Sequence, residues 1–171
     1  MGVVRALFAL ACIAGLTHAA FSAYWAAGGT WLLATAGQTM VEQFESMTWV
    51  LWIVAGIKAL AAVIPLLAPD NPLIRGVSWV GGFVLVVWGG LSTVIALAVF
   101  AGVYIPKGGI DRAGMIGHAF LWDPLFVLWG VALLGALATS PPRRERSCRC
   151  VTTVLARRQP RLTRIAPFSA V

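Results

Sequence analysis

Long apolar stretches separated by short polar ones dominate the pattern of hydrophobic and polar positions along the chain. A helix needs about 20 apolar residues to cross roughly 30 Å of hydrocarbon, and four stretches reach that length. They cover Val3–Ala27, Met47–Ala68, Val77–Val103 and Ala119–Ala138. The pattern therefore predicts an all-α protein built as a four-transmembrane-helix bundle.

The connections between these stretches are short. They are a loop over Gly28–Ser46, a tight turn over Pro69–Pro72 and a Gly-rich loop over Tyr104–His118, and Pro and Gly mark their ends as expected for helix termini. We therefore expect residues 1–140 to form one transmembrane domain. Residues 141–171 have neither helical periodicity nor an apolar face, and we expect a short, disordered, Arg-rich cytoplasmic tail.

The composition excludes a soluble globular protein. Hydrophobic residues make up 60% of the 171 residues and charged residues only 11%, against roughly 45–50% and 25% in soluble domains. The net charge of +7 comes from the tail, which holds eight of the thirteen Lys and Arg residues; before it, five basic residues balance five acidic ones. The basic tail therefore indicates which end of the chain faces the cytoplasm, and it does not indicate nucleic-acid binding. The partner we expect is the lipid bilayer.

Positive charges near the span ends predict the orientation of the chain, because Lys and Arg resist translocation across the membrane. If both termini lie on one side, that side holds Arg5, Arg75 and eight tail arginines, whereas the other holds only Lys107 and Arg112. We therefore expect a multi-pass protein of the plasma membrane with both termini in the cytoplasm.

A second interpretation of the N-terminus is a secretory signal. Arg5, the apolar run Ala6–Leu16 and the following small residues resemble such a signal with its cleavage site. The apolar character continues to Tyr24 and Trp25, however, which places an aromatic pair at the far interface as a retained span would.

Small residues recur at helical spacing and predict where the helices pack, because close backbone approach drives helix association in lipid. In the first span these residues are Ala11, Gly15, Ala19, Ala23 and Ala27. In the third span they are Gly82, Gly89, Thr93 and Ala96. Such faces would also allow two copies of the chain to associate. The alternative explanation of the same pattern is an alanine- and glycine-rich composition throughout the chain.

Three polar residues are expected within the hydrocarbon region, where each is costly and therefore a candidate for function. They are His18, Lys58 and Asp123. His18 shares a helix face with Ser22 and Trp25, so it should point into the bundle, either as a ligand or proton-relay residue or as a neutral histidine bonded to another helix.

Lys58 is about 15 Å from the inner end of its span, farther than its side chain extends, so we expect it to have a partner or to be neutral. One hypothesis is a contact with Asp123, either direct or through a water molecule. Alternatively, Asp123 followed by Pro124 is a typical helix N-cap and first turn. A helix beginning at Pro124 would be too short to cross the membrane, so either the span begins earlier with a kink at Pro124 or Trp122 and Asp123 dip in from the interface.

These polar residues and their neighbours form one candidate polar pocket. It contains His18, Ser22, Trp25, Lys58, His118 and Asp123.

No cofactor or metal is expected. Cys12 lies in the membrane and Cys148 and Cys150 on the predicted cytoplasmic side, so free thiols are expected. His18 and His118 should lie at different depths, which disfavours a haem between them. The sequence contains no phosphate-binding glycine loop, nucleophile elbow or zinc-protease motif.

Two sequence blocks carry a family resemblance: HAAFSAYWAAGGTW (His18–Trp31) and HAFLWDPLFVLWG (His118–Gly130). As a pair they resemble the actinobacterial branch of a bacterial family of small four-span integral membrane proteins known as a domain of unknown function. The resemblance covers most of Val3–Ala138. It implies four helices and an unassigned activity, with signature positions at His18, Trp25, Gly28, Gly29, Asp123 and Pro124.

The sequence thus favours a non-enzymatic integral membrane protein of unassigned molecular function, with a polar pocket toward the extracytoplasmic side and an unknown ligand. The alternative is a small-solute or ion transporter that uses Lys58 and Asp123. A membrane-embedded enzyme ranks third, because acid–base groups are present without a nucleophile or metal set.

Overall fold

The computed structural model describes residues 2–45, 47–105 and 109–140, and all regular structure in these residues is helical. The elements in chain order are α1 (Gly2–Ala26), the 3-10 helix η1 (Leu33–Ala36), α2 (Gln38–Glu45), α3 (Thr48–Leu67), α4 (Pro72–Phe100), α5 (Arg112–Phe120) and α6 (Trp122–Thr139). Four helical segments of this described part are long and apolar enough to cross a membrane: α1, α3, α4 and α5 together with α6. The all-α class with four membrane-spanning helices is confirmed. The Arg-rich tail, Cys148, Cys150 and Lys107 lie outside the described residues.

The third span begins at Pro72 rather than at the expected Val77. Asn71 is the N-cap, and its side-chain oxygen accepts hydrogen bonds from the backbone N–H groups of Leu73 (3.0 Å) and Ile74 (3.2 Å). Pro72 occupies the first turn, where its missing N–H costs nothing. A capped start therefore extends the helix beyond the apolar stretch that the hydropathy pattern identifies.

The fourth span begins at Arg112 rather than Ala119 and is interrupted at Leu121. The cause is Pro124, whose ring clashes with the carbonyl of the residue four positions earlier, Phe120. Leu121 leaves helical geometry (φ −126°, ψ −72°), and α6 resumes directly after it. Of the two alternatives for this span, the earlier start with a break is correct, and the break lies at Leu121 instead of Pro124.

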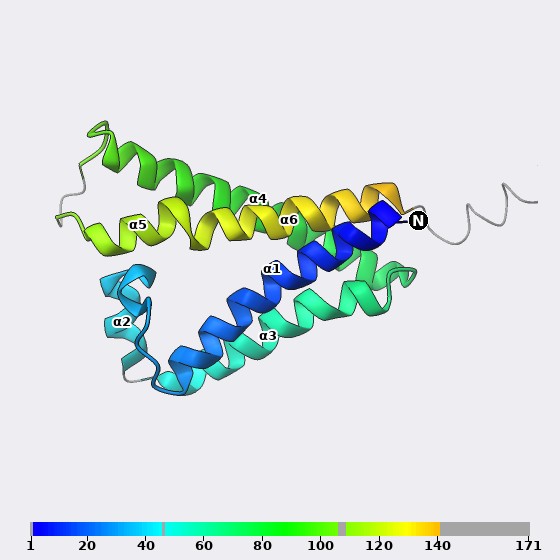
Figure 1. Ribbon diagram of the computed structural model, residues 1–171, viewed down its shortest axis with the longest axis horizontal. Coiled ribbons are helices and arrows are strands. Elements are labelled where there is room, and N and C mark those ends of the chain that lie inside the picture. Colours follow the sequence, from blue (N-terminus) through cyan, green and yellow to red (C-terminus); the bar gives the residue numbers. More distant parts are fainter. Residues whose placement is uncertain (1, 46, 106–108, 141–171) are drawn as a thin grey trace, which may run out of the picture. The chain divides into compact units, whose positions relative to one another are not determined.

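The helices pack as two pairs, α1 with α3 and α4 with α6, and α1 also contacts α6. Figure 1 shows the two pairs close together near the start of α1 and the end of α6, and separating toward α2 and α5. At the wide end, η1 and α5 contact each other across the gap. The main apolar core lies between α1, α3 and α6 and consists of Phe8, Ala11, Ala14, Ala62, Trp129, Ala132, Leu133, Ala136 and Leu137.

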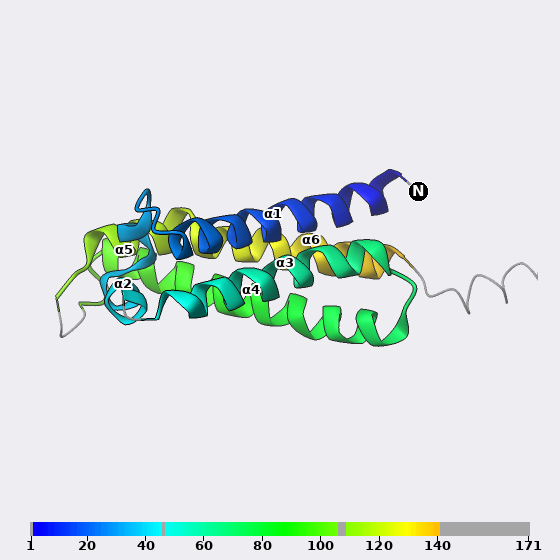
Figure 2. The same ribbon diagram turned by 90° about the horizontal axis from the view of Figure 1, so that it is seen from below.

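The described residues place the connections at two opposite ends, as both views show (Figures 1 and 2). One end, here the turn end, holds the start of α1, the α3–α4 turn and the end of α6. The other, here the loop end, holds η1, α2 and α5. At the turn end Arg75 donates hydrogen bonds to Pro69 O (3.2 Å), Ser140 Oγ (3.1 Å) and Leu137 O (2.9 Å), and so fastens the start of α4 to the end of α6.

Candidate functional site

Lys58, Ser22 and His18 form one hydrogen-bonded group between α3 and α1. Lys58 Nζ donates to Ser22 Oγ (3.1 Å), and Ser22 Oγ donates to His18 O (3.1 Å). Nζ also lies 5.6 Å from the centroid of the Phe126 ring, within range of a cation–π interaction. Lys58 is half-buried, whereas Ser22 is buried.

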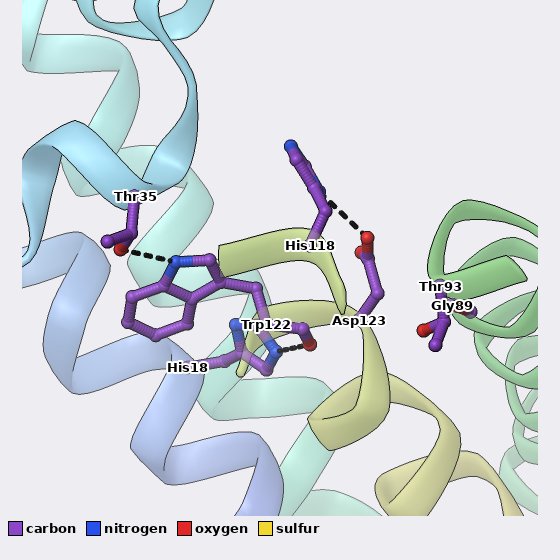
Figure 3. A network of polar contacts seen from close by, with 7 residues as sticks. All are labelled: His18, Thr35, Gly89, Thr93, His118, Trp122 and Asp123. Atoms are coloured by element: carbon purple, nitrogen blue, oxygen red, sulfur yellow. Dashed lines mark hydrogen bonds and ion pairs between the residues drawn. The ribbon is translucent and has the colours of Figure 1, made fainter. Parts of the chain in front are cut away.

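His18 connects this group to the start of α6. Its ring is 4% exposed and stacks on the Phe126 ring, with centroids 3.8 Å apart and planes 11° from parallel. Nε2 lies 3.0 Å from Trp122 O (Figure 3). Because a carbonyl oxygen only accepts hydrogen bonds, Nε2 carries a proton in this geometry. His18 thus packs in the interior and joins two helices.

His118 and Asp123 form a second group at the break between α5 and α6. Nδ1 of His118 and Oδ2 of Asp123 are 2.7 Å apart (Figure 3), and the Asp123 side chain is 3% exposed while that of His118 is 34% exposed. Asp123 also lies in the first turn of α6, where the helix dipole favours a negative charge. The carboxylate is therefore buried, and its histidine partner is partly accessible.

Trp122 links both groups to η1. Its indole N–H donates to Thr35 Oγ1 (3.0 Å), and its ring packs edge-on against Trp25, with centroids 5.2 Å apart. Figure 3 shows Trp122 between the Thr35 side chain and His18. The sequence analysis did not identify Thr35, because a lone threonine in a loop carries no distinguishing pattern.

The hypothesised direct contact between Lys58 and Asp123 is wrong. Lys58 bonds to Ser22 and Asp123 bonds to His118, because the interruption at Leu121 brings the end of α5 next to the first turn of α6. The N-cap role considered for Asp123 is also wrong, since the cap position is Leu121 and makes no side-chain cap. Five of the six candidate residues therefore form two groups, and the sixth, Trp25, packs against Trp122. His18 reaches the second group through its hydrogen bond to Trp122, the residue before Asp123.

A cavity of about 400 Å³ opens beside the first group, toward the loop end. Ser22, Trp25 and Lys58 line it, together with residues of η1, α2 and α3. Gly28 and Gly29 also line it; Gly28 has a φ of +89°, which favours glycine, and Gly29 lies against the Tyr24 ring with no space for a side chain. We call this space the loop-end cavity. Its volume falls within the roughly 300–1,000 Å³ of small-molecule sites.

Asp111 is a second residue that the sequence analysis missed. Its Oδ2 accepts a hydrogen bond from Gln38 N (2.7 Å) and its Oδ1 one from Gly114 N (3.0 Å), so it caps α5 and holds the start of α2. These hydrogen bonds, that from Gln38 first, hold the pKa of the Asp111 carboxyl below its usual range. An Asp before a short helical pattern is the signal that could have revealed it.

The arrangement provides proton-accepting and cation groups without a metal-binding set. Within the described ranges, no three His, Cys, Asp or Glu side chains are grouped to hold a metal ion. Cys12 is a buried free thiol. The described side chains offer hydrogen bonding, charge pairing and proton exchange at His118.

The fold and these buried polar groups define a small α-helical membrane protein. A family model matches residues 15–133, which include both blocks that carry the resemblance, and the chain belongs to that family, described as a protein of unknown function (DUF3995). No curated protein and no solved structure matches the chain. The family assignment confirms the resemblance and leaves the molecular function open.

Proposed function

We propose that this chain is a non-enzymatic membrane protein that binds a small anionic ligand in the loop-end cavity, on Lys58 and Ser22. One observation carries the proposal. Lys58 lines the cavity, its Nζ has one hydrogen bond, to Ser22 Oγ, and no carboxylate of the described residues lies within ion-pair distance of it. A cation held in an apolar region is costly unless it is paired, so an anionic ligand would complete this site.

The proposal includes the orientation in the membrane. The excess of basic residues at the termini and the α3–α4 turn favours a multi-pass plasma-membrane protein with both termini cytoplasmic. The loop-end cavity would then open toward the extracytoplasmic side. A four-helix bundle is the arrangement in which the two helix pairs enclose this polar region.

Ligand-dependent thermal stability of the full chain in detergent tests this function. A ligand that binds only the folded protein raises the melting temperature as its concentration exceeds Kd. We expect short-chain carboxylates such as butyrate to stabilise the native chain and to have no effect on Lys58→Met. Arg112→Met, which removes an exposed cation on α5, is the matched control and should retain the response. An equal butyrate-dependent rise in melting temperature in Lys58→Met and Arg112→Met would refute binding at Lys58.

A second candidate function is transport of the bound solute. The observation that favours it is the position of Lys58, which lines the loop-end cavity and also a separate groove between α3 and α4. A residue that borders two spaces is placed to pass a solute from one to the other. Uptake of labelled butyrate into proteoliposomes that is abolished by Lys58→Met would favour transport. Butyrate binding without uptake would support a binding function alone.

A further inference from the structure

The loop-end cavity is long and narrow. Its α3 side is one face of the helix, lined at spacings of three or four residues by Thr48, Leu51, Val54 and Lys58. The ten residue steps from Thr48 to Lys58 cover about 15 Å at about 1.5 Å per residue. A volume of about 400 Å³ spread over that length leaves a space about 5 Å across. Because carbon atoms in contact lie about 3.5–4.0 Å apart, the cavity admits one alkyl chain along its axis but not two side by side.

The two ends of the cavity differ in chemistry. Lys58 and Ser22, which are hydrogen-bonded to each other, line the inner end, and Thr48 lies at the outer end, where α3 begins. The apolar side chains of the lining come from η1, α2 and α3 and are Leu33, Ala36, Met40, Val41, Leu51 and Val54. A ligand that fits this lining therefore has a small polar head at the inner end and an apolar body.

The free hydrogen-bond donors at the inner end belong to Lys58. Ser22 Oγ donates to His18 O, so its proton is already used. The Trp25 indole N–H likewise donates to Trp31 O. An ammonium has three N–H donors, and the bond to Ser22 uses one of them. Helical side chains lean toward the helix N-terminus, which for α3 is the direction in which the cavity extends. The two remaining donors match the two oxygens of a single carboxylate.

The charge and the apolar lining exclude other classes of anion. Among the described residues, Lys58 is the one cation that lines the cavity, so a phosphate or sulfate dianion would keep one uncompensated negative charge in an apolar space. A sugar or nucleotide would lack hydrogen-bond partners for most of its hydroxyl groups. A monoanion with an alkyl body has neither defect.

We infer that the loop-end cavity binds a medium-chain monocarboxylate, with its carboxylate on Lys58 Nζ and its alkyl chain along α3 toward Thr48. The ammonium and its contact with the carboxylate occupy part of the cavity, so about 10 Å remain for the chain. Carbon–carbon bonds of about 1.5 Å that alternate in direction each advance a little over 1 Å, so about eight carbons fill this length. This inference rests on the proposed function, since it uses the same cavity and cation, and it names the class of anion.

Binding of radiolabelled octanoate to the full chain in phosphatidylcholine nanodiscs tests the inference, with empty nanodiscs as background. Octanoate should bind at least about tenfold more tightly than butyrate, measured by competition, because four further methylene groups are buried. Lys58→Met should weaken octanoate binding about tenfold or more, because charge-assisted hydrogen bonds are lost. Its effect on octanol, which has the same chain without the charge, should be much smaller.

Leu51→Trp tests where the alkyl chain lies. Leu51 lines the cavity about two helical turns from Lys58, so the larger ring should weaken octanoate binding about tenfold and leave butyrate binding unchanged. Ile53→Trp is the matched control, because Ile53 is 51% exposed on α3 and lies outside the lining. It should change the binding of neither acid.

The outcomes separate this inference from the proposed function. Butyrate binding through Lys58 with no gain for octanoate would overturn the inference and leave the proposed function standing. Octanoate binding that Leu51→Trp leaves unchanged would likewise overturn only the inference. Equal binding of octanoate to the native chain and Lys58→Met, or no binding of either acid, would overturn both. If a variant does not fold, the native chain still decides, because octanol binding as tight as that of octanoate contradicts a carboxylate site.

Discussion

At the residue scale, the buried carboxylate depends on a histidine that lies five positions earlier in the chain. Asp123 lies in the first turn of α6 and His118 in the last turn of α5, and the non-helical Leu121 between them allows their side chains to meet at 2.7 Å. Hydrogen bonds that involve a charged group are shorter and stronger than neutral ones. The pair therefore holds the last turn of α5 to the first turn of α6.

We predict strong energetic coupling within this pair and none between Asp123 and Lys58. His118→Gln and Asp123→Asn should each destabilise the protein by about 1.5–3 kcal/mol, because each leaves a partner unsatisfied. Their double variant should lose clearly less than the sum, whereas Lys58→Met with Asp123→Asn should be additive. Thermal unfolding in detergent measures both cycles. Additive losses for His118→Gln with Asp123→Asn, or coupled losses for Lys58→Met with Asp123→Asn, would contradict the contacts seen in the structure.

Asp111 has a different role, since it lies at the loop end outside the spans and is bonded to two backbone N–H groups. Its folded-state pKa is lowered, so its carboxylate stabilises the fold at pH values above its ordinary pKa. That stabilisation is lost as the pH falls through the lowered folded-state pKa, below about pH 4.

We therefore predict that the native chain loses stability more steeply on acidification than Asp111→Asn. Asparagine still caps a helix but has no carboxylate to protonate, so other acidic groups cancel in the comparison. Melting temperatures measured from neutral pH into the acid range should draw together as the pH falls through the lowered folded-state pKa of Asp111. If the melting temperatures of the two proteins fell by the same amount over this pH range, Asp111 would not be the source of the acid-dependent loss of stability.

At the scale of elements, glycines set how closely the helices approach. A Cβ added to Gly15 of α1 would lie 2.6 Å from Ala62 Cβ of α3 and 2.7 Å from the Trp129 ring of α6. A Cβ added to Gly89 of α4 would similarly lie 2.6 Å from the carbonyl oxygen of Asp123. Gly56 of α3, in contrast, has open space around it. Glycine is therefore required at some positions of these helices and not at others.

We predict opposite effects of alanine at two of these glycines. Gly15→Ala should destabilise the protein by about 1–3 kcal/mol, because the added methyl group forces α1 away from α3 and α6. Gly56→Ala should be neutral or stabilising by up to about 1 kcal/mol, because alanine has the higher helix propensity. Unfolding in detergent, or retention of monodisperse protein after heating, distinguishes the two. Equal losses would mean that Gly15 is not at a close helix contact.

The sequence predicted the number of spans because hydropathy over about 20 residues reports burial in lipid directly. It missed the starts of α4 and α5, because the caps Asn71 and Asp111 lie before the apolar stretches that were used to place the spans. Helical spacing placed His18 and Ser22 on one face, and both are buried. The partners of Lys58 and Asp123 could not be predicted, since they depend on the break at Leu121 and on which helices become neighbours.

At the scale of the whole described domain, the charge distribution and the packing agree on two distinct ends. The turn end holds Arg75 within a set of hydrogen bonds to backbone and Ser140, whereas the loop end holds Asp111 and the cavity beside Lys58. An even number of spans brings the start of α1 and the end of α6 to the same end (Figure 2). The orientation of this domain therefore decides which compartment has access to the cavity.

We predict that the loop end faces outward. In a chain whose native cysteines are replaced, a cysteine at Gln43 or Gly109 should react with a membrane-impermeant maleimide in intact cells, and one at Asn71 should react only after permeabilisation. The physical reason is the retention of basic residues in the cytoplasm, with Arg5, Arg75 and the eight tail arginines on one side against Lys107 and Arg112 on the other. Labelling of Asn71 in intact cells, with Gln43 protected, would invert the topology. The cavity would then take its ligand from the cytoplasm.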